Sequence, residues 1–291
     1  MRNILFDISG KIEKIGSNKV NVLYEVKKVA DSLKIPFFVV GASARDFILE
    51  HCYNIKSPRM TMDIDLGVEV ADWDEFNKLS EVLLSTGKFS KTRGKQRLFF
   101  RDVYIDIVPF GPIAGKDKKI SWPSEHEISM SILGFEEAYE YSITIRLSSK
   151  PELDIKFPTL SGLALMKIIS WKEMYPDRKT DAEDLLFIMK NYEDAGNEER
   201  LYSQALSLLE EEDFDTRLAG IRLLGMDIAK ISNPQTLKAV KEILEGETGE
   251  QSRYRLVEDM ISGISMYSDQ FDEILNYVEK LKEGISEVLH N

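Results

Sequence analysis

Cysteine and histidine are scarce in this chain. Of its 291 residues one is a cysteine, Cys52, and three are histidines. A single cysteine forms no internal disulfide and builds no cysteine zinc site. The histidines lack metal-ligand spacing, and no Ser–His–Asp arrangement is evident. The sequence therefore gives no support to a disulfide framework, a zinc centre or a serine hydrolase.

Long apolar runs are also absent. No stretch reaches the about 18 residues that a membrane-spanning helix needs, so we expect no membrane partner. Residues 1–7 contain no long apolar stretch followed by a small-residue cleavage site. We therefore expect no signal peptide and a cytoplasmic location. With 43% hydrophobic and 30% charged residues, the composition is ordinary for a globular protein and excludes a disordered or collagenous chain.

Excess negative charge is confined to the last third of the chain. Residues 1–190 contain 28 basic and 28 acidic side chains, whereas residues 191–291 contain 10 and 22, which accounts for the whole net charge of −12. A uniformly acidic protein repels nucleic acid, but here the neutral N-terminal part can still hold anions locally. We expect the two parts to have different roles.

Hydrophobic periodicity predicts the α+β class, with a mixed-sheet head followed by an all-α C-terminal region. Up to residue 157 helical and strand patterns alternate, and after it only helical patterns follow. Helices are expected over 20–34, 44–51, 73–85, 160–174, 179–192 and, with breaks, 199–285. Strands are expected over 37–40, 60–68, 97–101, 103–110 and, more weakly, 141–147 and 153–157. We expect a head at 1–157, a helical segment closing the active site at 158–195 and an acidic helical domain at 196–291.

A glycine and a serine stand where strand 37–40 is expected to turn into a helix, in the sequence Gly41-Ala42-Ser43-Ala44-Arg45-Asp46. Backbone N–H groups and the helix dipole at such a turn favour phosphate. Gly41 lets a ligand approach the backbone closely, and Ser43 offers a hydroxyl. The same residues are common at turns for steric and capping reasons, so the turn alone indicates no function.

Acidic residues interrupt two strands that otherwise look buried. In Asp63-Ile64-Asp65 two carboxylates share one strand face, and Asp106 lies between two isoleucines. Aspartate is depleted in strands, and neighbouring carboxylates repel unless a cation lies between them, a role that suits Mg²⁺. The alternatives are an exposed strand end for the pair and an edge-strand charge for Asp106. Taken in order with the Gly/Ser turn, the acids describe a triphosphate cradle beside a three-carboxylate metal site.

Over about residues 36–112 this constellation resembles the nucleotidyltransferase superfamily that shares its head with DNA polymerase β. The turn at 41–46 followed by Asp63-Ile64-Asp65 also looks like the head of tRNA nucleotidyltransferases and poly(A) polymerases. The closer resemblance is to the AbiEii/AbiGii-like group of predicted nucleotidyltransferases. There the head is followed by a helical region with a lysine and a basic–acidic cluster, which are here Lys167 and residues 178–184.

The resemblance implies transfer of a nucleoside monophosphate from an NTP to an acceptor hydroxyl, with release of pyrophosphate. It implies that Asp63, Asp65 and Asp106 are catalytic and hold Mg²⁺, two ions in all. It implies nucleotide binding by Gly41, Ser43, Arg45, Lys167, Lys179 and Asp181. It also implies a toxin-like or RNA-modifying role, with tRNA or another RNA as acceptor and an antitoxin-like protein as partner. A snorkelling lysine at 167 and a plain surface pair at 179 and 181 stay open as alternatives.

Six basic residues and no acidic one occupy residues 88–101, with phenylalanines interleaved. Such a run favours a nucleic-acid backbone or a triphosphate, and a solvated hairpin edge is the equal alternative. The expected nucleic-acid contacts are Lys91, Arg93, Lys95, Arg97 and Arg101. Arg97 and Arg101 are in phase on one strand and are expected to share a face. The tryptophans at 73, 122 and 171 are expected to be packing residues.

Two other functions fit the same head. One is a catalytically inactive nucleotide-binding regulator or scaffold, which Ala42, standing where many relatives have a second glycine, and the acidic C-terminal part both favour. The joint presence of three acids argues against it, since a dead site needs none of them. The other is an active enzyme whose acceptor is a protein side chain or a small molecule.

Overall fold

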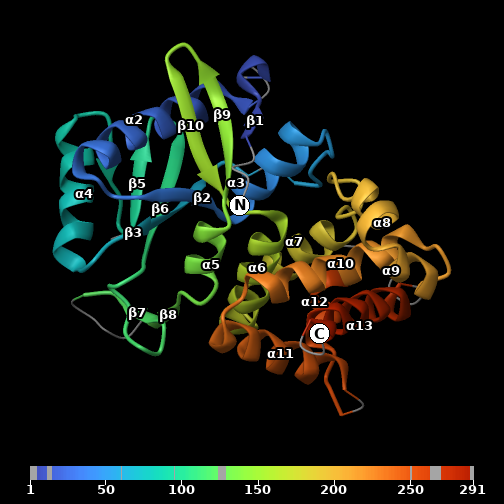
Figure 1. The fold of residues 1–291 in the computed structure, drawn as a ribbon. Coiled ribbons are helices and arrows are strands. Elements are labelled where there is room, and N and C mark those ends of the chain that lie inside the picture. The colour runs from blue at the N-terminus through green and yellow to red at the C-terminus, as the bar shows by residue number, and fades with distance from the viewer. Residues whose placement is uncertain are drawn as a thin grey trace. The chain divides into compact units, whose positions relative to one another are not determined.

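The computed structural model describes residues 5–11, 15–59, 61–94, 96–123, 129–249, 251–262 and 270–288. It divides into two compact units, residues 1–159 and 160–291 (Figure 1). The first unit is a mixed α/β head and the second is helical, which confirms the expected class. The division lies close to the expected boundary after residue 157. A further boundary at 195 stays a prediction.

A five-stranded mixed sheet of order β2-β3-β6-β5-β4 forms the centre of the head. Its strands are β2 (Phe37–Val40), β3 (Ile64–Glu69), β4 (Ser90–Lys91), β5 (Arg97–Phe100) and β6 (Val103–Phe110). Strand β3 runs parallel to β6, and the other neighbours are antiparallel. A second sheet has the order β1-β9-β10, with β1 (Leu5–Asp7), β9 (Ile143–Ser149) and β10 (Glu152–Phe157). Strands β7 (Lys119–Ser121) and β8 (Ser129–Ser131) form a separate pair.

Alternation along β3 and β6 separates an apolar face from an acidic one. Ile64 and Leu66 of β3 and Ile105 of β6 are fully buried. Helices α2 (Ser17–Leu33) and α4 (Trp73–Ser85) pack against each other, and α2 also packs on β6 (Figure 1). Because successive strand residues point to opposite faces, Asp65 and Asp106 lie on the face away from those isoleucines. The buried face thus fixes which way the two acids point.

Local signals explain most element ends of the head. The Asp72 carboxylate accepts a hydrogen bond from the Glu75 backbone N–H at 2.9 Å, which confirms the expected cap of α4. The helix expected over 44–51 begins earlier, as α3 (Gly41–Asp46), and continues into a π-helical turn at Phe47–Cys52. The strand expected over 60–68 begins at Ile64, so Asp63 directly precedes it; Met60 lies outside the described residues. A 3-10 turn (Ser9–Lys11), α5 (Phe135–Glu140) and strands β1, β4, β7 and β8 were not expected, because each is too short to show a period.

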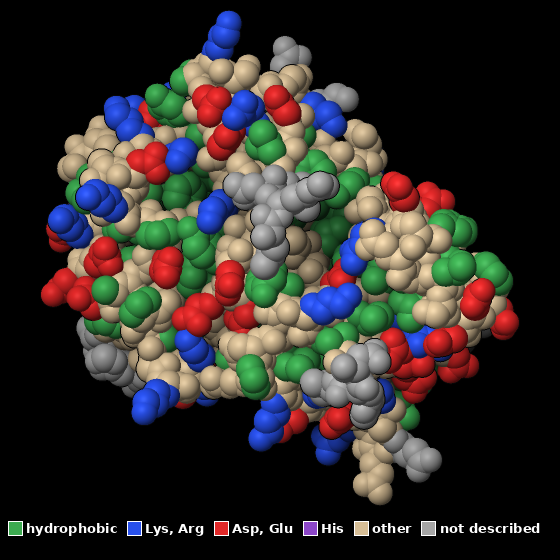
Figure 2. Space-filling view, in the orientation of Figure 1, with side chains coloured by type: hydrophobic (Ala, Val, Ile, Leu, Met, Phe, Trp, Pro, Cys, Tyr) green, Lys and Arg blue, Asp and Glu red, His purple; other side chains and the backbone are tan. Residues whose placement is uncertain are grey.

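Eight helices make up the described part of the second unit. They are α6 (Leu160–Met174), α7 (Thr180–Met189), α8 (Glu198–Gln204), α9 (Leu206–Glu211), α10 (Thr216–Ile231), α11 (Pro234–Thr248), α12 (Arg255–Ile261) and α13 (Phe271–Glu287). On the face shown in Figure 2, acidic side chains gather over the α13 region of this unit. Among the described residues of the whole chain, none of the helices is both long and apolar enough to cross a membrane.

Helices α10 and α13 cross at two glycines. A Cβ on Gly225 would lie 2.3 Å from the Leu281 carbonyl oxygen, and one on Gly284 would lie 2.0 Å from the Arg222 carbonyl oxygen. Real Cβ atoms do not approach backbone this closely, so the crossing requires glycine at both positions. The ordinary helical pattern of the sequence does not by itself show this contact.

Candidate active site

Two of the expected catalytic acids are neighbours across a pair of parallel strands. In the register of β3 and β6, Asp65 stands opposite Asp106, and Ile64 stands opposite Ile105. Neighbouring strands are about 4.8 Å apart, so paired residues present their side chains to the same patch of one face. Residues far apart in the sequence are thereby brought together at one place on the central sheet.

The Gly/Ser turn lies against the same acids. Gly41 has a φ of +69°, and a Cβ there would lie 2.1 Å from Asp65 Oδ2. The Ser43 hydroxyl, which is almost fully buried, donates a hydrogen bond to the Asp63 carbonyl oxygen. Position 41 therefore requires glycine for two reasons: its backbone is left-handed, and it packs closely against Asp65. The turn, Asp63 and Asp65 form one connected unit.

Arg97 joins the third acid to the first. Its Nε donates to Asp106 Oδ1 at 2.8 Å, a second guanidinium nitrogen bonds Asp106 Oδ2, and that nitrogen is also 3.2 Å from Asp63 Oδ2. The hydrogen bond to Asp106 raises the pKa of Arg97, and the charges of the three acids raise it further against a smaller opposing effect of burial. A positive charge thus lies among the expected metal ligands. We call Asp63, Asp65 and Asp106 together the acid cluster.

The acid cluster offers the ligand chemistry that Mg²⁺ prefers, namely carboxylate oxygens. Within the described ranges, however, no group of three acidic, histidine or cysteine side chains stands ready around a common point. The guanidinium of Arg97 pairs with both Asp63 and Asp106. The donor set fits the ion, and a divalent cation binding there has to compete with Arg97.

The other expected nucleic-acid contacts have different surroundings from the Arg97 guanidinium. Lys91 and Arg93 are exposed in and after β4, and Lys95 lies outside the described residues. Strand β5 ends at Phe100, so Arg101 falls in the turn, with a φ of +57°, and donates to Asn18 Oδ1 at 3.3 Å. The expectation that Arg97 and Arg101 share a strand face is therefore wrong. Their roles toward nucleic acid stay predictions.

Arg45 is fully buried beside the turn. Its guanidinium donates to Asp46 Oδ1, at 2.9 Å from Nε, and to Ser57 Oγ at 2.8 Å. These bonds tie the short helix α3 to the segment that leads into Asp63. A contact of Arg45 with nucleotide stays a prediction and requires this pairing to open.

In the second unit, Lys167 is held between two acids. Its ammonium lies 2.7 Å from Asp181 Oδ1 and 2.7 Å from Asp184 Oδ2, and its side chain is almost fully buried. Burial acts to lower the pKa of Lys167, but the two carboxylates outweigh it and the pKa is raised. The lysine therefore stays charged, and the expected residues 167 and 181 are direct partners across the α6–α7 pair. Binding of nucleotide by either residue stays a prediction.

Lys179 belongs to a different contact. Its ammonium lies 3.2 Å from Asp259 Oδ1, and the Trp171 indole donates to Asp259 Oδ2 at 2.9 Å. Lys179 and Asp181, two positions apart, thus face different partners. The expected role of Lys179 in nucleotide binding also stays a prediction.

Sequence reasoning missed the position of Arg97 at the acid cluster. The signal was present, because a hairpin that turns at residues 101 and 102 places residue 97 opposite residue 106. Opposite charges at such cross-strand positions attract and are common on antiparallel pairs. Counting the register of the hairpin would have identified this contact.

Comparison with known proteins supports the resemblance to nucleotidyltransferases. The model of the family described as "Nucleotidyl transferase AbiEii toxin, Type IV TA system" matches residues 28–277. No curated protein matches the chain.

Among solved structures, the antibiotic-resistance factor ANT(2'')-Ia has 13% sequence identity and a TM-score of 0.35, over 68% of this chain and 97% of that one. A nucleotidyltransferase-like protein from Paracoccidioides brasiliensis has 16% identity and a TM-score of 0.40, over 66% and 90%. An apo CCA-adding enzyme has 17% identity and a TM-score of 0.32, over 95% and 73%. These TM-scores lie below 0.5, so the assignment rests on the family match, which covers most of the chain. On that match, the chain belongs to the AbiEii family of nucleotidyl transferases and is a nucleotidyltransferase.

Proposed function

We propose that the protein transfers a nucleoside monophosphate from an NTP to an acceptor hydroxyl on RNA, with Mg²⁺ as cofactor and pyrophosphate as the second product. The observation that carries the proposal is the register of β3 and β6, which sets Asp65 beside Asp106 and next to the Gly41–Ser43 turn. The family is described as the toxin of a toxin–antitoxin system. We therefore propose that the protein acts as a toxin and that its partner is an antitoxin protein.

The proposed reaction assigns one task to each part of the site. The acceptor oxygen forms a bond to the α-phosphorus while the bond from that phosphorus to the β-phosphate oxygen breaks. We assign Asp106 to accepting the acceptor's proton once its bonds to Arg97 open, and Asp63 and Asp65 to binding the metal, with Asp106 shared between the two tasks. When bound, Mg²⁺ stabilises negative charge on the phosphates and on the acceptor oxygen. We assign the leaving phosphates to the backbone of the turn that begins at Gly41, and Ser43 to the same turn through its hydrogen bond to the Asp63 carbonyl oxygen.

Residues of the helical unit complete the proposal. For Lys167, Lys179 and Asp181 the nucleotide-binding role is proposed only as the family resemblance implies it, and Asp181 holds Lys167 in place within the helical unit. The pairs Lys167–Asp181 and Lys179–Asp259 support roles as charged groups held in fixed positions. Arg45 is assigned to the phosphate side through its contacts beside the turn.

Labelling with α-³²P NTPs tests the proposal. The full-length protein is incubated with each NTP, Mg²⁺ and total RNA, and the products are separated into RNA, protein and small molecules. Asp65→Asn and Asp106→Asn should each reduce labelling of RNA by at least about 100-fold. Asp31→Asn, which changes an exposed carboxylate on α2 that pairs with Lys27, should label as the wild type does.

Other outcomes would point elsewhere. Equal labelling by wild type and both site variants would remove the catalytic role of the acids. Label on protein or on a small molecule in place of RNA would refute RNA as the acceptor. Calorimetric binding of NTP and Mg²⁺ without pyrophosphate release under any condition would favour the regulator.

A further inference from the structure

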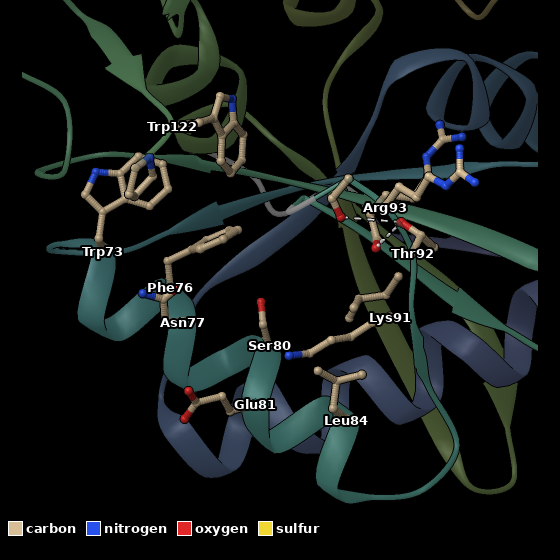
Figure 3. A pocket seen from close by; sticks show the side chains of 14 residues that line it. Trp73, Phe76, Asn77, Ser80, Glu81, Leu84, Lys91, Thr92, Arg93 and Trp122 are labelled. Carbon is tan, nitrogen blue, oxygen red and sulfur yellow. Dashed lines mark hydrogen bonds between the residues drawn. The ribbon is translucent and has the colours of Figure 1, made fainter. Parts of the chain in front are cut away.

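A pocket lies in the head beside the acid cluster. Its volume is about 410 Å³, and its lining comes from α4, from β4, β5 and the segment between them, and from the residues after β7 (Figure 3). A pocket of about 300–1,000 Å³ is typical of sites for small ligands. All lining residues belong to the first unit, so the pocket is complete within the head.

One wall of the pocket is aromatic. Trp73, Phe76 and Trp122 form a triangle, with ring centroids 5.2 Å apart for the two tryptophans and 5.5 and 5.6 Å for their distances to Phe76. Phe76 is buried, whereas both tryptophans are half-exposed. The tryptophan planes meet at 54°, so they do not stack on each other. These tryptophans therefore do more than fill the core, because ring surface remains for a planar ligand.

The opposite wall is cationic. Lys91 and Arg93 line the pocket, are exposed, and form no ion pair with a residue that the structure describes. Figure 3 shows Lys91 reaching toward α4. The segment between them and Arg97 is fixed by Thr92, whose hydroxyl donates to the Arg97 carbonyl at 2.8 Å. Glu81 is the acidic member of the described lining. A net positive wall facing aromatic rings suits a ligand with a phosphate and a base.

Arg97 connects the pocket to the acid cluster. It lines the pocket and at the same time bonds Asp106 and Asp63. Arg97 is thus the side chain that the pocket lining shares with the partners of Asp106. Strand β5 lies next to β6 on the side away from β3 and the Gly/Ser turn. Because Arg97 and Leu98 of β5 line the pocket, it lies toward the β5 side of the central sheet.

We propose that this pocket binds the acceptor of the transfer reaction as a terminal nucleotide of a single-stranded RNA end. The base packs against Trp73 and Trp122, and Lys91 and Arg93 bind the backbone phosphates. This inference rests on the proposed function. Polycationic small acceptors such as aminoglycosides are disfavoured, because they would meet the basic wall. Aromatic rings accept any base by stacking, so the pocket selects a nucleic-acid end without selecting its sequence.

Binding measurements test the pocket without catalysis. A fluorescent single-stranded RNA oligonucleotide is titrated with the full-length protein, without NTP, and followed by anisotropy. Trp122→Leu should weaken binding about 5- to 160-fold, since stacking on one base contributes about 1–3 kcal/mol. Tyr202→Leu, which removes an exposed aromatic ring of the second unit, should bind as the wild type does.

A second variant guards against loss of folding in the first. Lys91→Gln combined with Arg93→Gln keeps the aromatic wall and removes two phosphate contacts. The slope of log K against log salt concentration should then become shallower by about 1.4, because each phosphate contact to a single strand contributes about 0.7. Lys238→Gln, an exposed lysine of α11, is the matched control.

The results separate the two proposals. Asp65→Asn should bind RNA like the wild type while losing transfer. If RNA binding and its salt slope are unchanged in both pocket variants, the pocket proposal is wrong even when labelling of RNA is confirmed. If RNA is not labelled but the pocket variants lose binding, the pocket stands and the proposed reaction is wrong. Tighter binding of a polycationic aminoglycoside than of RNA would overturn the acceptor class.

Discussion

Gly41 provides the sharpest test of how the turn and the acid cluster depend on each other. In Gly41→Ala the added methyl would lie 2.1 Å from Asp65 Oδ2, 2.9 Å from its Cγ and 3.1 Å from its Cβ. Turning the carboxylate alone does not relieve contacts with all three atoms, so the Asp65 side chain has to move by about 1 Å. A misplacement of that size can reduce the catalysed rate about 100-fold.

Backbone strain has to be separated from this displacement. Gly41 has a φ of +69°, and alanine in that region costs about 1–2 kcal/mol of folding free energy. Gly87 has a φ of +70°, and a Cβ there has nothing within 4 Å. Gly87→Ala therefore carries the same strain without the contact and is the matched control.

The assays are urea unfolding and the rate of NTP-dependent labelling. Gly87→Ala should lose about 1–2 kcal/mol of stability from strain alone, and Gly41→Ala should lose at least as much. Gly41→Ala alone should lose about 100-fold in kcat, and Gly87→Ala should keep wild-type kcat. Equal kcat for the two variants would refute the reasoning, because strain would then account for everything and the packing on Asp65 would be irrelevant.

Three further predictions concern packing, charge and reactivity. Gly284→Ala places a Cβ 2.0 Å from a carbonyl oxygen of α10 and should destabilise the protein by about 1–3 kcal/mol in urea unfolding. Gly246→Ala in α11, where a Cβ has nothing within 4 Å, should stabilise it by about 0.5–1 kcal/mol. The opposite order of stabilities would contradict the helix crossing. Lys167→Met leaves two buried carboxylates without their cation and should lower the free energy of unfolding by about 3–5 kcal/mol. Lys172→Met, at an exposed position, should lower it by less than about 0.5 kcal/mol. Equal unfolding midpoints for the two variants would show that the buried pairing is unimportant. Burial raises the pKa of the Cys52 thiol to about 12, so at pH 8 about one thiol in 10⁴ is ionised. Iodoacetamide should therefore modify Cys52 far more slowly in the folded protein than in the urea-unfolded one. Comparable rates of modification, measured by mass spectrometry, would contradict the burial of Cys52.

The order of elements and the candidate acids follow from local patterns in the sequence. Strand alternation around Asp106 and the apolar residues beside Asp65 predict one polar face on two buried strands, and the structure has that face. The cap at Asp72 and the change from mixed to helical patterns after residue 157 were likewise predictable. These features are local because periodicity and capping depend on residues a few positions apart.

Only the tertiary structure decided which of these residues meet. The pairing of β3 with β6 sets Asp65 opposite Asp106, and no local pattern specifies the register of two strands that are not joined by a hairpin. The fold likewise brings Arg97 to Asp63 and Asp106, and sets Lys167 between two acids of the next helix. Electrostatic partners depend on distances of a few ångströms between segments far apart in the chain, and those distances exist only once the sheet and the helices have packed.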